Sequence, residues 1–165
     1  MMNAKSHSSK DNQPPLISDQ ELVSKTSVFD AIFSDRLEAS FVYRDDKVAA
    51  IMDIQPINHG HVLVIPIRQA RFLNELDAAT AGHLFNIGCR IAGAIRSSGI
   101  PCEGVNMLLA DGASAGQEVP HVHLHVFPRF AGDGFGFKHA ERYFTLPPRA
   151  ELEAVAGKIR DALED

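Results

Sequence analysis

The sequence predicts an α+β fold, in which a five-stranded antiparallel sheet packs with one long helix and short flanking helices. Five short segments have the alternating or continuously apolar pattern of strands, and a tight polar turn separates the first two. One long segment, residues 77–99, has apolar side chains at helical spacing. Hairpin strands with a single long helix are typical of an α+β fold with an antiparallel sheet.

Length and composition indicate one globular domain. The chain has 165 residues, of which 45% are hydrophobic, and this is enough for a real core. Residues 1–16 are polar and nearly free of large apolar side chains, so we expect a disordered tail there. Residues 17–165 are expected to form a single domain, with a C-terminal helix from about residue 149.

Charge and targeting signals narrow the class of partner. The net charge is −5 with dispersed Lys and Arg, so no basic stripe for a polynucleotide is expected, although a small phosphate ligand needs only a local site. No signal-like or membrane-spanning apolar run is visible. Cys89 and Cys102 form no motif, and free thiols in a reduced compartment are the simplest interpretation, with one disulfide as the alternative. We therefore expect a cytoplasmic protein without membrane association.

The N-terminal part of the domain predicts a helix followed by three strands. Residues 18–33 form the helical segment, with Ser18 as the expected N-cap and Glu21 completing a capping box. Residues 41–53 predict two strands around a tight turn at residues 44–47, and residues 61–67 predict a buried strand.

The long helix is bounded by Asp77, its expected N-cap, and by Gly99, which lies where a helix stops. Its apolar stripe consists of Leu84, Ile87, Ile91 and Ile95. Three glycines lie inside it, each at a cost of about 1 kcal/mol relative to Ala; they are Gly82, Gly88 and Gly93. Close packing against another element explains them, and a loosely built helix is the alternative.

The C-terminal part predicts two further strands and a short helix. Residues 104–110 and 121–127 form the strands, and residues 111–120 form a loop rich in turn-forming residues. Apolar residues at helical spacing follow Pro147 and Pro148 and predict the helix; they are Leu152, Val155, Ile159 and Leu163.

The strand 121–127 carries three histidines at every second position. Because side chains alternate along a strand, His121, His123 and His125 are expected on one face, roughly 6.6 Å apart. Val122, Leu124 and Val126 would then be buried, while the histidine face stays open. Three interpretations of this row remain open. It is a polar strand face that carries histidines by chance, a metal site, or a site for acid–base or nucleophilic chemistry on an anion.

The other histidines have different interpretations. His61 begins the strand 61–67, and it joins the histidine face if this strand pairs with the strand 121–127. His59 is expected in a solvated loop. Three more are expected outside any site: His83 on the exposed side of the long helix, and His7 and His139 in flexible or loop segments.

The segment before the histidine strand, AGQEVP, contains Gly116. A glycine turn that enters a strand can aim successive amide N–H groups at an anion, and an ordinary turn uses glycine equally well.

Together these segments resemble the histidine triad (HIT) superfamily. His121 to Phe127 match its signature His-φ-His-φ-His-φ-φ, where φ is apolar. VYRDDKVAAIMDIQPINHGHVLVIP resembles the family's N-terminal block, and DGASAGQEVPHVHLHVFPRFAGDGF resembles its C-terminal block. PRFAGD is especially similar to the fragile-histidine-triad branch and related bacterial members. The resemblance covers roughly residues 27–136.

The resemblance implies a mechanism. The middle histidine, here His123, attacks the α-phosphorus of a nucleoside phosphate, and water then hydrolyses the nucleotidyl-histidine intermediate. The backbone carbonyl of His121 would fix the tautomer of His123. His125 and His61 would contact phosphoryl oxygens and the leaving atom.

The resemblance also implies the substrate contacts. Asp53 would accept from the ribose hydroxyls of an adenosine-type nucleotide, beside Ile54. Backbone amides around Gly116, Gln117, Glu118 and Val119 would hold the phosphoryl oxygens. No cofactor is implied.

The chain departs from the family pattern at several positions. Some members hold a structural zinc, but Ser27, Asp30 and Gln69 stand where its ligands are expected, so no metal site is predicted. Ala110 replaces an amide residue that reaches a phosphate. Glu118 stands where several members have Ser or Thr, and a carboxylate there weakens anion binding unless it turns outward.

The predicted function is a nucleotide hydrolase or transferase that cleaves dinucleoside polyphosphates or other adenylated compounds at the α-phosphate. Nucleoside phosphoramidates and acyl-adenylates are the neighbouring substrate classes. A nucleotide-binding protein with little turnover is one alternative, and a metal-dependent enzyme with His121, His123 and His125 as ligands is another. A homodimer is expected, because family members are mostly two-fold dimers.

Overall fold

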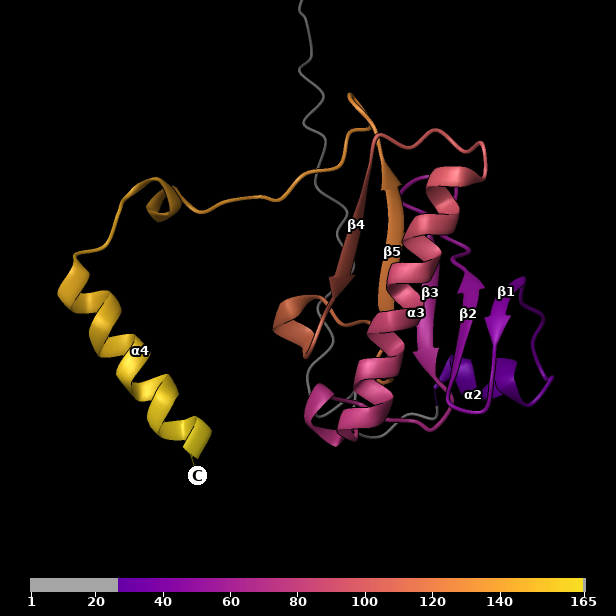
Figure 1. Cartoon of the computed structure of the whole chain (residues 1–165), viewed down its shortest axis with the longest axis horizontal. Coiled ribbons are helices and arrows are strands. Elements are labelled where there is room, and N and C mark those ends of the chain that lie inside the picture. Colours follow the sequence, from indigo (N-terminus) through magenta and orange to yellow (C-terminus); the bar gives the residue numbers. More distant parts are fainter. Residues whose placement is uncertain (1–26, 165) are drawn as a thin grey trace, which may run out of the picture. The chain divides into compact units, whose positions relative to one another are not determined.

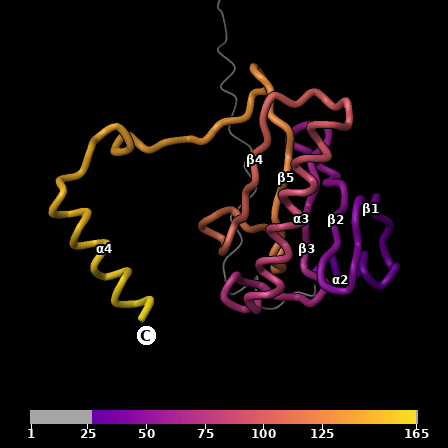
Figure 2. Tube along the Cα trace, viewed as in Figure 1, coloured from indigo at the N-terminus to yellow at the C-terminus, as the bar shows by residue number. Residues whose placement is uncertain are grey.

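The computed structural model describes residues 27–164 and confirms the predicted α+β class (Figure 1). The elements in chain order are α2 (Val28–Phe33), β1 (Phe41–Arg44), β2 (Val48–Met52), β3 (Val62–Pro66), the 3₁₀ helix η1 (Leu73–Glu75), α3 (Ala78–Ser97), β4 (Gly104–Leu109), η2 (Ala113–Ala115), β5 (Leu124–Arg129), η3 (Glu141–Phe144) and α4 (Arg149–Glu164). The five strands form one antiparallel sheet in the order β1-β2-β3-β5-β4, which can be followed along the tube in Figure 2.

The described part of the predicted helical segment 18–33 contains the helix α2. Ser27 is its N-cap: the Ser27 hydroxyl accepts from the amide of Phe29, and Asp30 Oδ2 accepts from the amide of Ser27, so the capping box is built from these two residues. The predicted cap Ser18, its partner Glu21 and the tail 1–16 lie outside the described residues.

The hairpin between β1 and β2 forms where it was predicted. Asp45 Oδ1 accepts from the amides of Lys47 and Val48, and this closes the turn. Asp45 Oδ2 lies 2.6 Å from Nε2 of His83 on α3. His83 is therefore partly exposed, with a side chain 29% accessible, because the sheet brings the turn up to the helix and supplies a partner.

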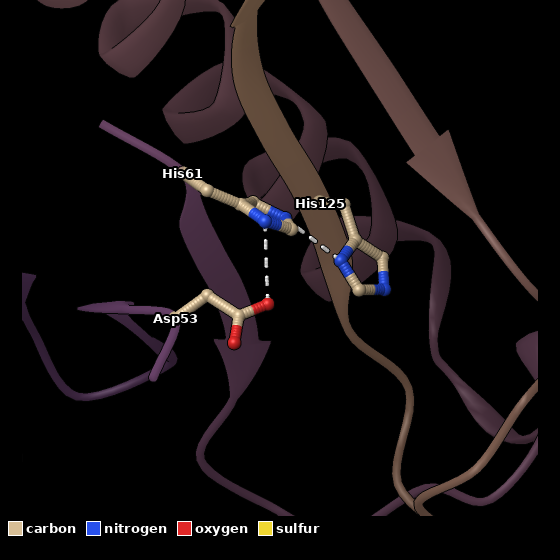
Figure 3. A group of neighbouring side chains, drawn as sticks. All are labelled: Asp53, His61 and His125. Atoms are coloured by element: carbon tan, nitrogen blue, oxygen red, sulfur yellow. Dashed lines mark hydrogen bonds and ion pairs between the residues drawn. The ribbon is translucent and has the colours of Figure 1, made fainter. Parts of the chain in front are cut away.

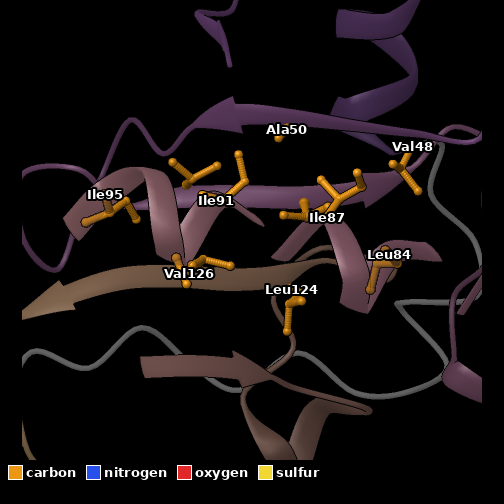
Figure 4. Packing of buried hydrophobic residues seen from close by; sticks show 11 residues of the cluster. Val48, Ala50, Leu84, Ile87, Ile91, Ile95, Leu124 and Val126 are labelled. Atoms are coloured by element: carbon orange, nitrogen blue, oxygen red, sulfur yellow. The ribbon is translucent and has the colours of Figure 1, made fainter. Parts of the chain in front are cut away.

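One face of the sheet packs against α3 and forms the main hydrophobic core (Figure 4). The stripe Leu84, Ile87, Ile91 and Ile95 lies on alternate residues of β2, β3 and β5. Gly88 allows this close approach, because a Cβ atom there would lie 2.6 Å from Met107 Cε and 2.7 Å from Leu124 Cδ2. Close packing thus accounts for Gly88, whereas Gly82 and Gly93 have no atom of the described chain within 4 Å of such a Cβ.

The opposite face of the sheet packs against α2. Phe29 and Ile32 of the helix join a second buried cluster with Ile51, Leu63 and Ile65. Since β2 and β3 are covered on both faces, their residues are buried almost without interruption. His125 lies in register with Leu63, on the α2 face, so this second layer is the one that surrounds the histidines.

The chain divides into two compact units at Asp133 and Gly134. The first contains the sheet, α2 and α3. The second, Gly134–Asp165, contains η3 and α4, and the described residues of α4 include none that is buried. That residues 17–165 form one domain stays a prediction. In the part of the chain that is described, no helix has the length and apolarity needed to cross a membrane.

Candidate functional site

Strands β3 and β5 bring four histidines together beside α2. His61 immediately precedes β3, and its ring centroid lies 5.1 Å from that of His125 on β5. The centroids of His123 and His125 lie 4.8 Å apart. The two strands do pair, and this meets the condition under which His61 joins the row.

The sequence predicted an open histidine face, but in the structure His121 and His123 are covered. His121 is fully buried and His123 is only 6% exposed. Both precede β5, which begins at Leu124, and the ring of Phe29 on α2 lies edge-on to each of them, with centroids 5.6 and 5.5 Å away. The strand pattern could not reveal this cover, because α2 comes from a distant part of the sequence.

The ring of His123 is held in one tautomer by the backbone. Nδ1 of His123 lies 2.7 Å from the carbonyl oxygen of His121. A carbonyl can only accept, so Nδ1 carries the hydrogen and the lone pair is on Nε2. This is the arrangement that a nucleophilic imidazole requires.

His121 is oriented in the same way. Its Nε2 lies 2.8 Å from the carbonyl oxygen of Pro66 and donates to it. Its Nδ1 is the buried side-chain atom without a hydrogen-bond partner among the described residues, and Asp30 Oδ1 lies 3.9 Å from it, beyond hydrogen-bonding distance. The backbone carbonyl of His121 is thus the group that accepts from the His123 ring, and its expected role in the reaction stays a prediction.

Asp53, His61 and His125 form a polar cluster at the end of the row (Figure 3). Nε2 of His61 lies 2.9 Å from Nδ1 of His125, and Nδ1 of His61 lies 3.3 Å from Asp53 Oδ2. One ligand atom from each residue lies within 4.8 Å of the others, so the set could hold a metal ion. The inner nitrogens of the two rings already face each other, and a metal there would displace that hydrogen bond.

Burial keeps the histidines neutral. It lowers the pKa of His123, against the opposing effects of the His121 carbonyl, Asp53 and Glu118. Burial and the neighbouring His123 and His61 lower the pKa of His125 to about 4. Burial lowers the pKa of His61 and of His121 as well. At neutral pH the row thus offers lone pairs and N–H donors rather than positive charge.

In the loop before the triad, the amides of Gly116 and Gln117 are hydrogen-bonded within the loop itself. The amide of Gly116 donates to the carbonyl of Ala113, and the amide of Gln117 donates to that of Gly112. The Gln117 side chain is also engaged: its Oε1 accepts from Gly112 and its Nε2 donates to Arg71. The loop closes on itself and uses these two amides, and their expected role in holding phosphate stays a prediction.

Glu118 and Val119 keep their amides free of hydrogen bonds to the described chain. The Glu118 side chain is exposed, as anion binding requires of a carboxylate there. Gly116 has φ +89°, a left-handed conformation that explains why a glycine stands at this turn.

A cavity of about 510 Å³, with Ile54 in its lining, was not predicted. Its lining includes the expected residue Ile54 together with Leu37 and Phe41, and polar groups from Asp35, Glu38 and Ser40. Ile54 is 94% exposed, so its side chain is free to pack against a ligand. Isolated apolar residues around a turn gave no pattern from which the sequence could have predicted this wall.

Comparison with known proteins places the fold and these histidines in one family. Residues 35–132 match the family model described as the HIT domain. The chain belongs to the HIT family. A HIT-like protein of Borreliella burgdorferi is 40% identical over 70% of this chain and 84% of that relative. A HIT family crystal structure from Bacillus anthracis superposes with a TM-score of 0.75 at 32% identity, covering 82% of this chain and 96% of the other.

Two HIT relatives have names that state an activity. An asymmetrical bis(5'-nucleosyl)-tetraphosphatase of Schizosaccharomyces pombe is 37% identical over 55% of this chain and 50% of the relative. An adenylylsulfatase of Arabidopsis thaliana is 30% identical over 72% of this chain and 60% of the relative.

A zinc-bound HIT structure from Mycobacterium smegmatis is 36% identical to this chain, with a TM-score of 0.64 over 86% of this chain and 99% of the other. The residues at the expected zinc positions do not fit that metal here. The Ser27 hydroxyl and the Asp30 carboxylate serve the capping box of α2, and Gln69 Nε2 donates to the carbonyl of Pro120. Neither a thiolate nor an imidazole stands at these three positions, so this HIT chain offers no tetrahedral nitrogen–sulfur set there.

Proposed function

We propose that this protein is a nucleotide hydrolase or transferase that cleaves adenosine-type nucleotides at the α-phosphate through a nucleotidyl group on His123. Membership of the HIT family and the two named hydrolases among its relatives support nucleotide hydrolysis in general. The observation that carries the finer proposal is the hydrogen bond from His123 Nδ1 to the His121 carbonyl, since it leaves the Nε2 lone pair for attack.

The first step forms a bond between Nε2 of His123 and the α-phosphorus and breaks the bond to the leaving oxygen, which takes the electron pair. Positive charge develops on the imidazole. The His121 carbonyl, Asp53 and Glu118 all favour that charge, although burial keeps the free ring neutral. The charge is thus stabilised as it forms, which is where stabilisation lowers a barrier.

In the second step water attacks phosphorus and the P–N bond breaks, returning its electron pair to Nε2 of His123. His125 and His61 are assigned to hydrogen bonds with phosphoryl, leaving or water oxygens. Amides of Glu118 and Val119 are the available donors in the neighbouring loop. Asp53 is assigned to the ribose, and the cavity of Leu37, Phe41 and Ile54 to the base.

A nucleotide-binding role with little turnover is the second candidate. It is favoured by Ala110 and Glu118, and by the engaged amides of Gly116 and Gln117, which leave fewer donors for phosphate. Dinucleoside polyphosphates are the favoured substrates, with phosphoramidates and acyl-adenylates as alternatives. We further propose a cytoplasmic homodimer that needs no cofactor and binds neither a polynucleotide nor a membrane.

The test is release of AMP from a panel of these adenylated compounds by protein purified with EDTA. We expect release that EDTA does not diminish, and its loss by several orders of magnitude in His123→Ala. Rapid quenching with labelled substrate, followed by intact mass, should detect AMP on His123. The exposed His59 provides the matched control, and His59→Ala should retain turnover.

Absence of release from the whole panel would favour the binding role. Variants of His125 or His61 that slow the second step should accumulate the adduct. If the wild type and these variants turn over substrate without any adduct, water attacks the α-phosphorus directly. Because His123 is buried and bonded to His121, His123→Ala should also lower the free energy of unfolding by about 1–3 kcal/mol. The melting temperature of the variant must therefore be measured with its activity.

A further inference from the structure

We propose that Asn58 is a positioning residue for the histidine cluster: with Asp133 and Arg129 it fastens the loop 53–61 to the end of β5 and so determines which ring nitrogen of His61 carries the proton. This group of three residues is called the latch below. The catalytic consequence rests on the proposed function, whereas the effect on His61 does not.

The loop 53–61 is closed by its own backbone. The amide of Asp53 donates to the His61 carbonyl, and the amide of His61 donates to the Asn58 carbonyl. Asp53 Oδ1 accepts from the amide of Gln55. These bonds turn the amide of Ile57 towards the imidazole of His61, with 3.1 Å between Ile57 N and His61 Nδ1.

The Ile57 amide selects a tautomer of His61. An amide nitrogen always carries its hydrogen and can only donate, so Nδ1 of neutral His61 must accept and Nε2 must carry the proton. The carboxylate of Asp53, 3.3 Å from the same Nδ1, favours a proton there instead. The position of the loop relative to His61 therefore decides between the two arrangements.

The tautomer of His61 determines that of His125, because the two rings share a hydrogen bond. When Nε2 of His61 carries the proton it donates to Nδ1 of His125 across 2.9 Å. Neutral His125 must then carry its own proton on Nε2, the nitrogen that points away from His61 in Figure 3. A donor at this position suits an oxygen of a phosphoryl or leaving group.

The latch connects this loop to β5 over a large sequence separation. Asn58 Nδ2 donates to the carbonyl of Pro128 and to Asp133 Oδ2, both at 2.9 Å. Two acceptors at one nitrogen also establish which end of the amide is the NH₂ group. Asp133 is almost fully buried and forms a two-pronged ion pair with Arg129, with N–O distances of 2.6 and 2.9 Å.

The latch thus ties the loop of His61 to the strand that carries His125. The Asp133 carboxylate is a firm anchor, because its side chain is only 3% exposed and separating a nearly buried carboxylate from a charged partner is costly. Loss of the Asn58 bridge should let the loop, and the Ile57 amide with it, move away from Nδ1 of His61.

The experiment is Asn58→Ala, which removes the bridge and leaves the Asp133–Arg129 pair in place. The matched control is Asn86→Ala on the exposed side of α3. Nitrogen-15 NMR of the histidine rings reports the tautomer directly and needs no substrate. We expect wild type and control to hold His61 with the proton on Nε2, and Asn58→Ala to populate the Nδ1–H form.

Turnover provides the second measurement. We expect kcat of Asn58→Ala to fall by about ten- to a hundredfold with KM nearly unchanged, since Asn58 positions a group without touching substrate. If Asn58→Ala does not fold, Asp133→Asn keeps the side-chain volume, weakens the same anchor and should shift the His61 tautomer likewise.

An unchanged His61 tautomer in folded Asn58→Ala or Asp133→Asn would overturn the proposal, as would wild-type protein with the proton on Nδ1. If no nucleotide is turned over by the wild type, the proposed function fails. The tautomer shift is still observed in that case if the latch acts as described.

Discussion

At the scale of single residues, backbone groups decide which ring nitrogen carries the hydrogen in three of the histidines. The carbonyls of His121 and Pro66 each accept from an imidazole, and the amide of Ile57 donates to a third ring. Because these partners are uncharged, they orient the rings without raising net charge in a buried region. The free lone pair of His123 is a consequence of this geometry.

The pKa directions at these residues predict the acid limb of activity. His123 must be neutral to attack, and burial lowers its pKa below the ordinary value of about 6.5. We therefore expect kcat/KM to stay constant from neutral pH down past 6.5 and to fall only at lower pH. A pH profile checks this, and an inflection at or above pH 6.5 would contradict it.

The same pKa shifts predict how stability depends on pH. Unfolded histidines titrate near 6.5, whereas His125 in the fold titrates at about 4, so the unfolded state binds more protons between these values. Stability is therefore fully present above pH 6.5 and is lost as pH falls towards 4. Denaturant titrations should show a smaller loss for His125→Asn than for wild type, and an equal loss would count against this account.

At the scale of elements, α3 is set against the sheet by one glycine. Gly88→Ala places a methyl group less than 3 Å from Met107 and Leu124, so we expect destabilisation by about 1–3 kcal/mol. Gly93→Ala is the matched control in the same helix, with no described atom near the new methyl group, and it should stabilise by about 0.5–1 kcal/mol. Thermal unfolding of both variants tests this, and equal changes in melting temperature would exclude close packing as the role of Gly88.

The helix α2 is held in place by its capping box and by Phe29, Ile32 and their apolar neighbours. Since Ser27, Asp30 and Gln69 are used in hydrogen bonds, we expect no stoichiometric structural zinc in the purified protein. Elemental analysis tests this, with the melting temperature measured before and after chelation. About one tightly bound zinc per chain would overturn the prediction.

At the scale of the whole molecule, the exposed side of α3 is the surface on which we expect a second copy to pack. Gly82 and Gly93 leave open space there, and Phe85 is 58% exposed between them. We expect a homodimer of about twice 18.0 kDa, which light scattering at micromolar concentration would detect. Phe85→Glu should weaken it, and monomer alone in the wild type would disprove the prediction.

The sequence by itself determined the strands, the long helix and the identity of the triad. Helical spacing at residues 84–95 predicts the buried face of α3, because a helix carries that burial in its own pattern. Alternation at residues 121–127 predicts an extended segment, although His121 and His123 are buried as well and β5 begins at Leu124. The sequence predicted the place of His61 only as a condition, because the pairing of β3 with β5 is a property of the folded sheet.

Only the tertiary structure decided how the site is covered and held. Phe29 closes over His123, Ile57 orients His61, and Asn58 reaches Asp133 across 75 positions of the chain. None of these contacts has a periodic signal, because a contact between distant segments depends on how whole elements pack. The same holds for the loop before the triad, where the amides of Gly116 and Gln117 are used by the loop's own turn. The histidines were thus visible in the sequence, while their burial and the position of their ring hydrogens arise from packing.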